Sequence, residues 1–359
     1  MGDSDNRTTG RTTGRTTGLT TVEGQAPVVR VRNLVDLARL AGVSAGTVSR
    51  ALAGNALVNI QTREKIEAIA REHDFRPNQM ASRLRTKRTG LIGVVIPLGH
   101  ERRQHLSDPF FMTMLGQLAD LITENGYDIL LSRVIPESPD WLTRIVDSGM
   151  LDGVLMIGQS DQFDAIEQTA SRYRPLVAWG HHRDGQLHCT VGMDNAAGGR
   201  LAAEHLICRG ARRLAFLGDV RAPEIAARHA GFAAAAASAG LRVELLPTHL
   251  AVDEMEADIS HHAGLIDGQF DGVFAASDMI AMRTLRALAD RAIAVPERVA
   301  IIGFDDLPLA SQTVPRLTTV RQDIAPGTVA MVETLFQRMA GVDTPSTVMQ
   351  PTLIIRDSA

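Results

Sequence analysis

Cysteine and aromatic residues are scarce in this sequence. Only two of its 359 residues are cysteine, Cys189 and Cys208, and aromatic residues make up 4%. Two cysteines provide neither a disulfide framework nor a zinc-ligand set, and this scarcity is typical of a reducing compartment. The longest apolar runs, Val94–Leu98 and Gly231–Ala237, are far shorter than the ~20 residues of a membrane span. The N-terminus has no apolar signal-peptide core, so we expect a cytoplasmic protein without a membrane partner.

The sequence also lacks the common motifs of enzyme chemistry. It contains no nucleophile elbow, no P-loop and no Gly-x-Gly-x-x-Gly at a strand-to-helix turn. His181 and His182 are adjacent, but no third metal ligand is apparent near them. We therefore expect no catalytic residue, no bound metal and no cofactor.

Charge is distributed unevenly along a chain of otherwise ordinary globular composition. Hydrophobic residues make up 45% and charged residues 22%. Residues 1–90 carry 15 Lys and Arg against 8 Asp and Glu, whereas residues 91–359 carry 22 against 33. A basic front on an acidic body predicts a polyanionic partner for the front. A basic tail without a target is the alternative.

The sequence divides into four parts. Residues 1–29 form a low-complexity extension with three tandem Arg-Thr-Thr-Gly repeats, which we expect to be disordered. Residues 30–76 have the pattern of short helices, and residues 77–90 form a linker with four cationic and no acidic residues. Residues 91–359 alternate strand and helix patterns, and their length favours two α/β lobes.

The strands of this last part are continuous apolar runs. Such runs, separated by helices such as Arg200–Cys208 and Ala281–Ala289, predict parallel sheets covered on both faces. The expected strands are Leu91–Pro97, Tyr127–Leu131, Gly153–Ile157, Leu176–Trp179, Leu214–Gly218, Gly272–Ala275 and Val299–Phe304.

Residues 34–53 have the spacing of a helix-turn-helix. Ala38 is the small residue where two helices cross, Gly42 is the turn, and Leu37, Val43 and Val48 are apolar anchors. The second helix would enter the major groove of double-stranded DNA by its N-terminal end. An ordinary pair of packed helices is the alternative. Ser44 suits the N-cap of this helix, and Asn59 suits that of a third.

The residues expected to face DNA lie at the start of the second helix. Arg50 can reach guanine or phosphate, and Thr47 and Ser49 can reach phosphates or bases. The remaining candidates are Ser44, Ala45 and Gly46.

These residues resemble the start of lactose/galactose-repressor (LacI/GalR) family regulators. The similarity lies in Val35-Asp36-Leu37-Ala38 through Val43-Ser44, followed by Thr47-Val48-Ser49-Arg50. It continues through segments in the same order as in that family, over roughly residues 30–356. They are Arg76-Pro77-Asn78, Asp108-Pro109-Phe110-Phe111, Val191-Gly192-Met193-Asp194-Asn195, Ile302-Gly303-Phe304-Asp305-Asp306 and Leu317-Thr318-Thr319-Val320-Arg321-Gln322.

The resemblance implies a homodimeric transcription regulator that binds a near-palindromic operator. It implies an all-α headpiece, a hinge helix and a two-lobed core like that of periplasmic sugar-binding proteins. In the family, a hinge leucine wedges into the minor groove; Leu84 matches it, Ala81 matches the small residue beside it, and Asn78 lies at the hinge entry. Leu84 could instead pack on its own core.

One departure from the family affects base recognition. The first two residues of the recognition helix usually read bases, and here they are Ala45 and Gly46. Alanine can contact a thymine methyl group, whereas glycine offers no side chain. We expect base discrimination to depend more on Arg50 and Thr47.

The resemblance also assigns an effector site for a small molecule, with a carbohydrate or its phosphate favoured and a purine as an alternative. Arg228, Asp305 and Gln322 match the family's effector contacts, and Ser277 and Asp278 hold the place of another. Each has a simpler interpretation, because Asp278 and Asp305 could cap helices and Arg228 could lie on a helix surface.

Two further features bear on this site. Trp179 ends a predicted strand, where it could stack on a sugar or pack between strands and helices. Gly180 replaces an acidic contact of some relatives, and the polar stretch Gly99–Ser107 could close over a ligand or cap the first strand. A solute-binding protein with the same core is the main alternative function, and an α/β enzyme is another.

Overall fold

The computed structural model describes residues 31, 33–52, 54–55, 57–75 and 88–359. The chain forms two compact units, Met1–Ser82 and Arg83–Ala359. The predicted extension 1–29 and most of the predicted linker 77–90 lie outside the described residues. None of the helices among the described residues is long and apolar enough to span a membrane.

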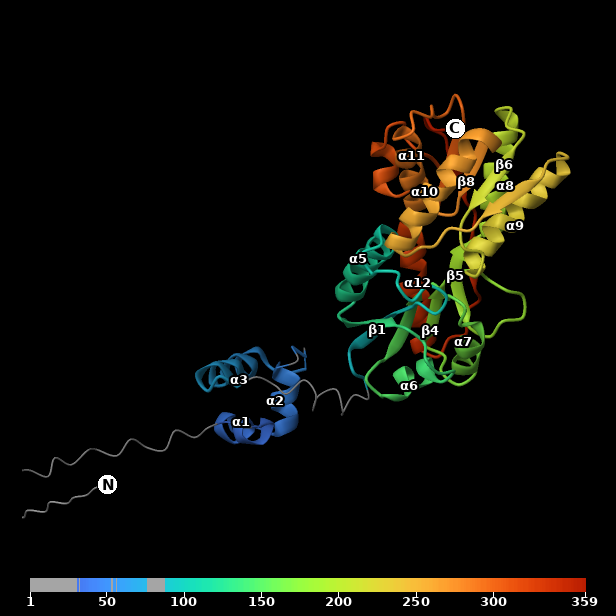
Figure 1. Ribbon diagram of the computed structural model, residues 1–359. Coiled ribbons are helices and arrows are strands. Elements are labelled where there is room, and N and C mark those ends of the chain that lie inside the picture. The colour runs from blue at the N-terminus through green and yellow to red at the C-terminus, as the bar shows by residue number, and fades with distance from the viewer. Residues whose placement is uncertain (1–30, 32, 53, 56, 76–87) are drawn as a thin grey trace, which may run out of the picture. The chain divides into compact units, whose positions relative to one another are not determined.

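The first unit is built from three short helices around a small apolar core (Figure 1). These are α1 (Leu34–Ala41), α2 (Ala45–Leu52) and α3 (Ile60–Glu72). The predicted caps form, because Ser44 Oγ accepts from Thr47 N at 3.1 Å and Asn59 Oδ1 accepts from Gln61 N at 2.9 Å. Gly42 has a φ of 71°, a left-handed conformation that glycine adopts without strain and that ends α1.

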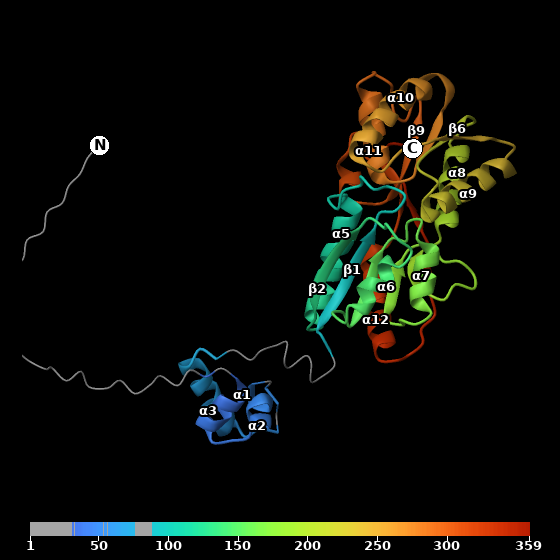
Figure 2. The same cartoon turned by 60° about the horizontal axis from the view of Figure 1, so that its bottom comes forward.

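The second unit contains two six-stranded sheets, which define two α/β lobes (Figures 1 and 2). The first sheet has the order β11-β5-β4-β3-β1-β2, and the second has the order β12-β10-β9-β8-β6-β7. All neighbouring strands are parallel except β10 and β12. The prediction of two lobes with parallel sheets is therefore confirmed.

The strands of the first sheet are β1 (Leu91–Pro97), β2 (Asp128–Val134), β3 (Gly153–Ile157), β4 (Leu176–Trp179), β5 (Cys189–Met193) and β11 (Thr347–Met349). Those of the second sheet are β6 (Leu214–Leu217), β7 (Val243–Leu246), β8 (Gly272–Ala275), β9 (Ala300–Asp305), β10 (Thr318–Arg321) and β12 (Thr352–Ile354). The chain therefore crosses between the lobes three times: before β6, before β11 and before β12.

Helices cover both faces of the first sheet. Buried side chains of α5 (Pro109–Glu124) and α12 (Ile324–Met339) form one core with β1, and those of α6 (Trp141–Asp147) and α7 (Phe163–Ala170) form the other. Successive strand residues alternate between these cores, with Val94 in the first and Val95 in the second.

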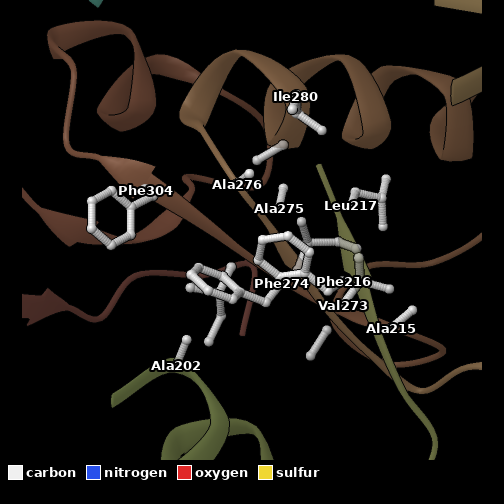
Figure 3. Packing of buried hydrophobic residues seen from close by; sticks show 14 of the residues in the cluster. Ala202, Ala215, Phe216, Leu217, Val273, Phe274, Ala275, Ala276, Ile280 and Phe304 are labelled. Carbon is white, nitrogen blue, oxygen red and sulfur yellow. The ribbon is translucent and has the colours of Figure 1, made fainter. Parts of the chain in front are cut away.

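The second lobe has one continuous core around its sheet. Four helices contribute to it: α8 (Asn195–Cys208), α9 (Pro223–Ser238), α10 (Val252–Gln269) and α11 (Asp278–Ala289). Figure 3 shows Ile280 of α11 and Ala202 of α8 on opposite sides of the strands that carry Phe216 and Phe274. A short 3₁₀ helix, η1 (Pro308–Gln312), follows β9.

Glycines bring α8 and α9 into backbone contact. A Cβ atom on Gly199 would lie 2.0 Å from Arg228 O, and one on Gly231 would lie 1.9 Å from Ala196 O. These close approaches leave no room for a side chain at either position. The glycines thus fix the position of α9, the helix that carries Arg228.

Candidate DNA-binding unit and effector cavity

The first unit has the geometry that its sequence predicts for a helix-turn-helix. Leu37 of α1 and Val48 of α2 are fully buried, and Ala38 is 5% exposed. Val43 N donates to Ala38 O at 3.1 Å, which closes the turn at Gly42. Lys65 of α3 donates from Nζ to Ala41 O at 3.0 Å, so the third helix fixes the end of α1.

The predicted DNA-facing residues lie on the first turns of α2. Arg50 is exposed, and a Cβ atom on Gly46 would lie 3.8 Å from Arg50 Nη1. The Arg50 guanidinium therefore lies beside Gly46, near the helix end that would enter a groove. The hydroxyls of Ser44 and Thr47 are 2.9 Å apart and hydrogen-bonded to each other. Ala45 and Ser49 are partly exposed.

Three predicted DNA contacts, Asn78, Ala81 and Leu84, lie outside the described residues. The structure therefore leaves their roles in the hinge as predictions.

A cavity lies between the two lobes of the core, at the carboxyl ends of parallel strands. Pro97 ends β1, Trp179 ends β4 and Asp305 ends β9, and all three line it. This edge is where open α/β sheets bind ligands. The cavity has a volume of about 120 Å³ and is lined by residues of both lobes.

Arg228 is fixed inside this cavity by protein groups. Its side chain donates from Nε to Asn195 Oδ1 at 2.8 Å and from Nη1 to Ala276 O at 2.6 Å. The guanidinium carbon lies 3.7 Å from the centre of the Phe304 ring, a cation–π contact. Arg228 is only 7% exposed, so the interpretation as a surface residue is wrong. Among the described residues, Nη2 has no hydrogen-bond partner.

Asp305 and Gln322 form a hydrogen-bonded pair beside Arg228. Gln322 Nε2 donates to Asp305 Oδ1 at 2.6 Å. Burial raises the pKa of Asp305 to about 7, although Arg228 and Gln322 both act to lower it. Asp305 has a φ of 126°, a backbone conformation that is strained for a residue with a side chain. Asp305 does not cap η1, which begins without a side-chain cap.

The structure separates the roles of Ser277 and Asp278. Ser277 lines the cavity and also caps α11, because its Oγ accepts from Ile280 N at 3.3 Å. Asp278 is fully buried and is absent from the cavity lining. Its carboxylate accepts from Leu307 N at 2.8 Å and from Thr319 Oγ1 at 2.5 Å. Asp278 follows β8, so it holds the segment after β9 and strand β10 to the start of α11. This placement does not support the predicted direct effector contact of Asp278.

Trp179 packs against a helix, as one of its two interpretations predicts, and it also lines the cavity, so stacking on a sugar stays a prediction. Its side chain lines the cavity, yet a Cβ atom on Gly327 of α12 would lie 2.3 Å from its ring. The six-membered ring thus packs closely on α12. The indole nitrogen has no hydrogen-bond partner among the described residues.

Several cavity residues carried no separate prediction as contacts. Glu224 lies close to Gly180, because a Cβ atom on that glycine would lie 2.5 Å from Glu224 Oε1. Asp108, His100, Gln104 and Ser160 also line the cavity. Asp108 belongs to a segment that carries the family resemblance. Glu224 gave no signal in the sequence, because a glutamate in the first turn of a helix is common.

The cavity therefore combines three carboxyl groups with one guanidinium. Burial raises the pKa of Asp108. Burial lowers the pKa of Arg228, whereas the negative charges of Asp305, Glu224 and Asp278 act to raise it. No group of three or more His, Cys, Asp or Glu residues placed for a metal ion occurs within the described ranges.

Comparison with known proteins identifies the chain. A family model described as "Bacterial regulatory proteins, lacI family" matches residues 33–78, and one described as "Periplasmic binding protein-like domain" matches residues 203–359. The transcriptional regulator RegA of Clostridium saccharobutylicum is 31% identical over 340 residues, which cover 91% of this chain and 98% of RegA. The chain belongs to the LacI family of bacterial regulatory proteins. Another relative of this LacI-family chain, GalS of Salmonella typhimurium, is 30% identical and covers 90% of it and 95% of GalS.

Solved structures agree with this assignment. The lac repressor dimer bound to operator and the anti-inducer ONPF matches with a TM-score of 0.79 at 23% identity, covering 91% of this chain and 98% of that one. The regulator CelR in complex with cellobiose matches with a TM-score of 0.64 at 26% identity, covering 92% and 100%. As a member of the LacI family of bacterial regulatory proteins, the chain is a DNA-binding transcriptional regulator and not an enzyme.

Proposed function

We propose that this LacI-family protein is a homodimeric repressor of carbohydrate-utilisation genes, controlled by an uncharged sugar in the core cavity. The observation that carries the proposal is the cavity itself, in which Arg228, Asp305 and Gln322 meet at the carboxyl ends of the strands. Relatives support the gene class: a sucrose operon repressor of Pediococcus pentosaceus is 28% identical and a ribose operon repressor of Halalkalibacterium halodurans is 28% identical.

The hydrogen-bonding groups of the cavity favour hydroxyl groups. Asp305 and Glu224 line the cavity, where their carboxylate oxygens can accept from hydroxyl donors. Arg228 Nη2 and the Trp179 indole nitrogen can donate to hydroxyl oxygens. Ser277 and Gln322 complete the proposed contacts, and Asp278 contributes by holding the loop after β9.

A sugar phosphate fits this cavity poorly. Arg228 is the only guanidinium that the described residues contribute to the lining, and two of its nitrogens already donate to Asn195 and Ala276. The carboxylate of Glu224, and those of Asp108 and Asp305 when they are ionised, would repel a phosphate. An uncharged sugar avoids this repulsion.

The DNA-binding half of the proposal depends on α2 and the hinge. We propose that Arg50 and Thr47 contact bases or phosphates, with Ser44, Ala45, Gly46 and Ser49 lining the same groove. Two headpieces related by a dyad would read a near-palindromic operator, and Asn78, Ala81 and Leu84 would form its hinge contacts. Such a protein acts in the cytoplasm, where the operator is.

Isothermal titration calorimetry tests the effector site. The full chain is titrated with sucrose, D-ribose, D-galactose and cellobiose, and with a phosphorylated form of any sugar that binds. The proposal expects one uncharged sugar to bind and its phosphate to bind much more weakly. Binding of the phosphate alone, or of no sugar, would contradict it.

A further inference from the structure

The segment that follows β1 reaches from one lobe to the other. We call residues 98–107 the strap. In the first lobe, Ser160 Oγ accepts from Gly99 N at 3.0 Å and from His100 N at 3.2 Å. Arg133 of β2 donates from Nη2 to the carbonyl oxygen of Arg102 at 2.7 Å. The start and middle of the strap are thus fixed to the first sheet.

Other strap residues contact the second lobe. Glu101 is 6% exposed, and its Oε2 accepts from Leu250 N at 3.4 Å. Arg103 forms an ion pair with Glu254 of α10, with 2.5 Å between Nη1 and Oε1. The strap therefore forms one wall of the cavity rather than only ending the first strand.

His100 is the strap residue whose hydrogen bonding is incomplete. Its Nδ1 lies 2.7 Å from Ser160 Oγ, and Ser160 has a φ of 54°, a left-handed conformation unusual for a serine. Its other ring nitrogen, Nε2, is buried without a hydrogen-bond partner among the described residues. Gln104, which also lines the cavity from the strap, already donates from Nε2 to Asp108 Oδ2 at 3.1 Å.

We infer that His100 contacts the effector and that its Nε2 pairs with a hydroxyl group of the uncharged sugar. This inference rests on the proposed function. A buried ring nitrogen without a partner is unfavourable, and a ligand bound in the cavity can supply one. Ser160 and the cross-lobe contacts of Glu101 and Arg103 hold the ring in place before the sugar binds.

A hydroxyl group suits this nitrogen in both tautomers of neutral histidine. If Nδ1 carries the proton, Nε2 accepts a hydrogen bond; if Nε2 carries it, Nε2 donates one. A hydroxyl group can donate and accept, so it satisfies either case. The site would then hold its sugar from both lobes, with His100 on one side and Asp305 with Arg228 on the other.

Calorimetry on four variants of the full chain tests the inference with sucrose, D-ribose, D-galactose and cellobiose. For the sugar that binds the wild type, His100→Ala should weaken binding by on the order of tenfold. The control is His105→Ala, because His105 lies on the same strap but is exposed, and it should change affinity less than about twofold.

Two conservative variants separate direct contact from a purely structural role. His100→Gln places an amide near the position of Nε2, whereas His100→Asn places one near Nδ1, where it can still bind Ser160. The inference expects the Gln variant to keep more sugar affinity than the Asn variant. Wild-type affinity in His100→Ala, or better rescue by Asn than by Gln, would overturn it. Absence of sugar binding by the wild type would overturn the proposed function together with the inference.

Discussion

Asp152 and Gly90 are hydrogen-bonded to each other at the start of the core unit. The Asp152 carboxylate accepts from the Gly90 backbone nitrogen at 2.8 Å. The same carboxylate accepts from Thr89 N at 2.7 Å and from Thr89 Oγ1 at 3.1 Å. Thr89 and Gly90 are the last residues of the predicted linker 77–90 and directly precede β1. A single side chain thus fixes the backbone of the two residues that lead into β1.

Replacing Asp152 should loosen this attachment. Asp152→Asn substitutes an NH₂ donor for one of the acceptor oxygens, so it places a donor opposite a donor. We expect faster hydrogen exchange at the amides of Thr89 and Gly90 and a core destabilised by about 1–3 kcal/mol. Hydrogen-exchange mass spectrometry and urea unfolding measure both effects.

Asp147→Asn is the matched control for this variant. Asp147 binds only the exposed Arg172 side chain, with 2.9 Å between Nη2 and Oδ2, on the same lobe. The Asp147→Asn substitution should leave hydrogen exchange at the amides of Thr89 and Gly90 unchanged. It should alter the free energy of unfolding by less than about 1 kcal/mol. Equal effects of the two substitutions would show that Asp152 has no special role.

Asp305 should give core stability a dependence on pH. Its pKa in the folded protein is about 7, above the ordinary value of 3.8. Between these values the folded state binds a proton that the unfolded chain has released, so stability attributable to this group falls as pH rises. Asp305→Asn removes that titration. The free energy of unfolding of the variant minus that of the wild type should therefore increase by roughly 2–4 kcal/mol from pH 4 to pH 8.

Urea unfolding at pH 4, 6 and 8 measures this difference, and calorimetry checks sugar binding. The variant should lose sugar binding because its NH₂ group donates where a carboxylate oxygen would accept from a hydroxyl group. Parallel pH profiles for the two proteins would show that Asp305 is ionised at ordinary carboxyl pH, and retained sugar binding would remove it from the site.

The contact between α8 and α9 should tolerate no side chain. Gly199→Ala would place a Cβ atom 2.0 Å from Arg228 O, so the backbone of α9 must shift. We expect destabilisation by about 1–3 kcal/mol and weaker sugar binding, because Arg228 moves with its helix. Gly264→Ala on α10 is the control, since its Cβ atom meets nothing within 4 Å. Gly264→Ala should stabilise the core by about 0.5–1 kcal/mol in thermal or urea unfolding. Equal changes in stability for Gly199→Ala and Gly264→Ala would contradict the close packing of α8 on α9.

Arg50 should carry much of the base discrimination. Arg50→Ala should weaken binding to the selected operator by about 1–3 kcal/mol and relax its sequence preference. Arg71→Ala on α3, which removes another exposed arginine of the same unit, should weaken operator and random DNA to a similar small extent. Fluorescence anisotropy with both DNAs measures this, and an unchanged operator preference in Arg50→Ala would refute a base-reading role.

Gly46→Ala should be tolerated. A Cβ atom at this position would lie 3.7 Å from Ser44 Oγ and 3.8 Å from Arg50 Nη1, which are ordinary contacts. We expect operator affinity within about threefold of wild type. A loss as large as that of Arg50→Ala would indicate that DNA approaches the helix backbone at Gly46.

Continuous apolar runs made several strands predictable from sequence. Those of β1, β3, β4 and β8 appear at their predicted bounds, because each is buried on both faces. The edge strand β2 begins and ends later than predicted, since Leu130 and Leu131 are exposed and burial does not mark its end. Strands β7, β11 and β12 gave no apolar signal because each is short and has at most one fully buried residue.

The candidate site was only partly predictable. Arg228, Asp305 and Gln322 follow from the family resemblance, and the structure brings them together. Glu224 could not be identified, because its significance depends on the approach of a distant segment, at Gly180. His100 was predicted only as part of a polar stretch that could close over a ligand, because its contact with Ser160 cannot be read from the sequence. Asp278 has the sequence position of a contact, but Leu307 and Thr319 bind its carboxylate.

The central claim is that sugar in the core cavity controls binding of DNA by the first unit. Fluorescence anisotropy tests it with the full chain, a duplex selected from random DNA by this protein and a scrambled duplex, each with and without sucrose, D-ribose, D-galactose and cellobiose. The account predicts one dimer per selected duplex, an affinity at least about a thousandfold above that for the scrambled duplex, and a change in affinity with one sugar. Equal affinity for both duplexes, unaffected by every sugar, would contradict it.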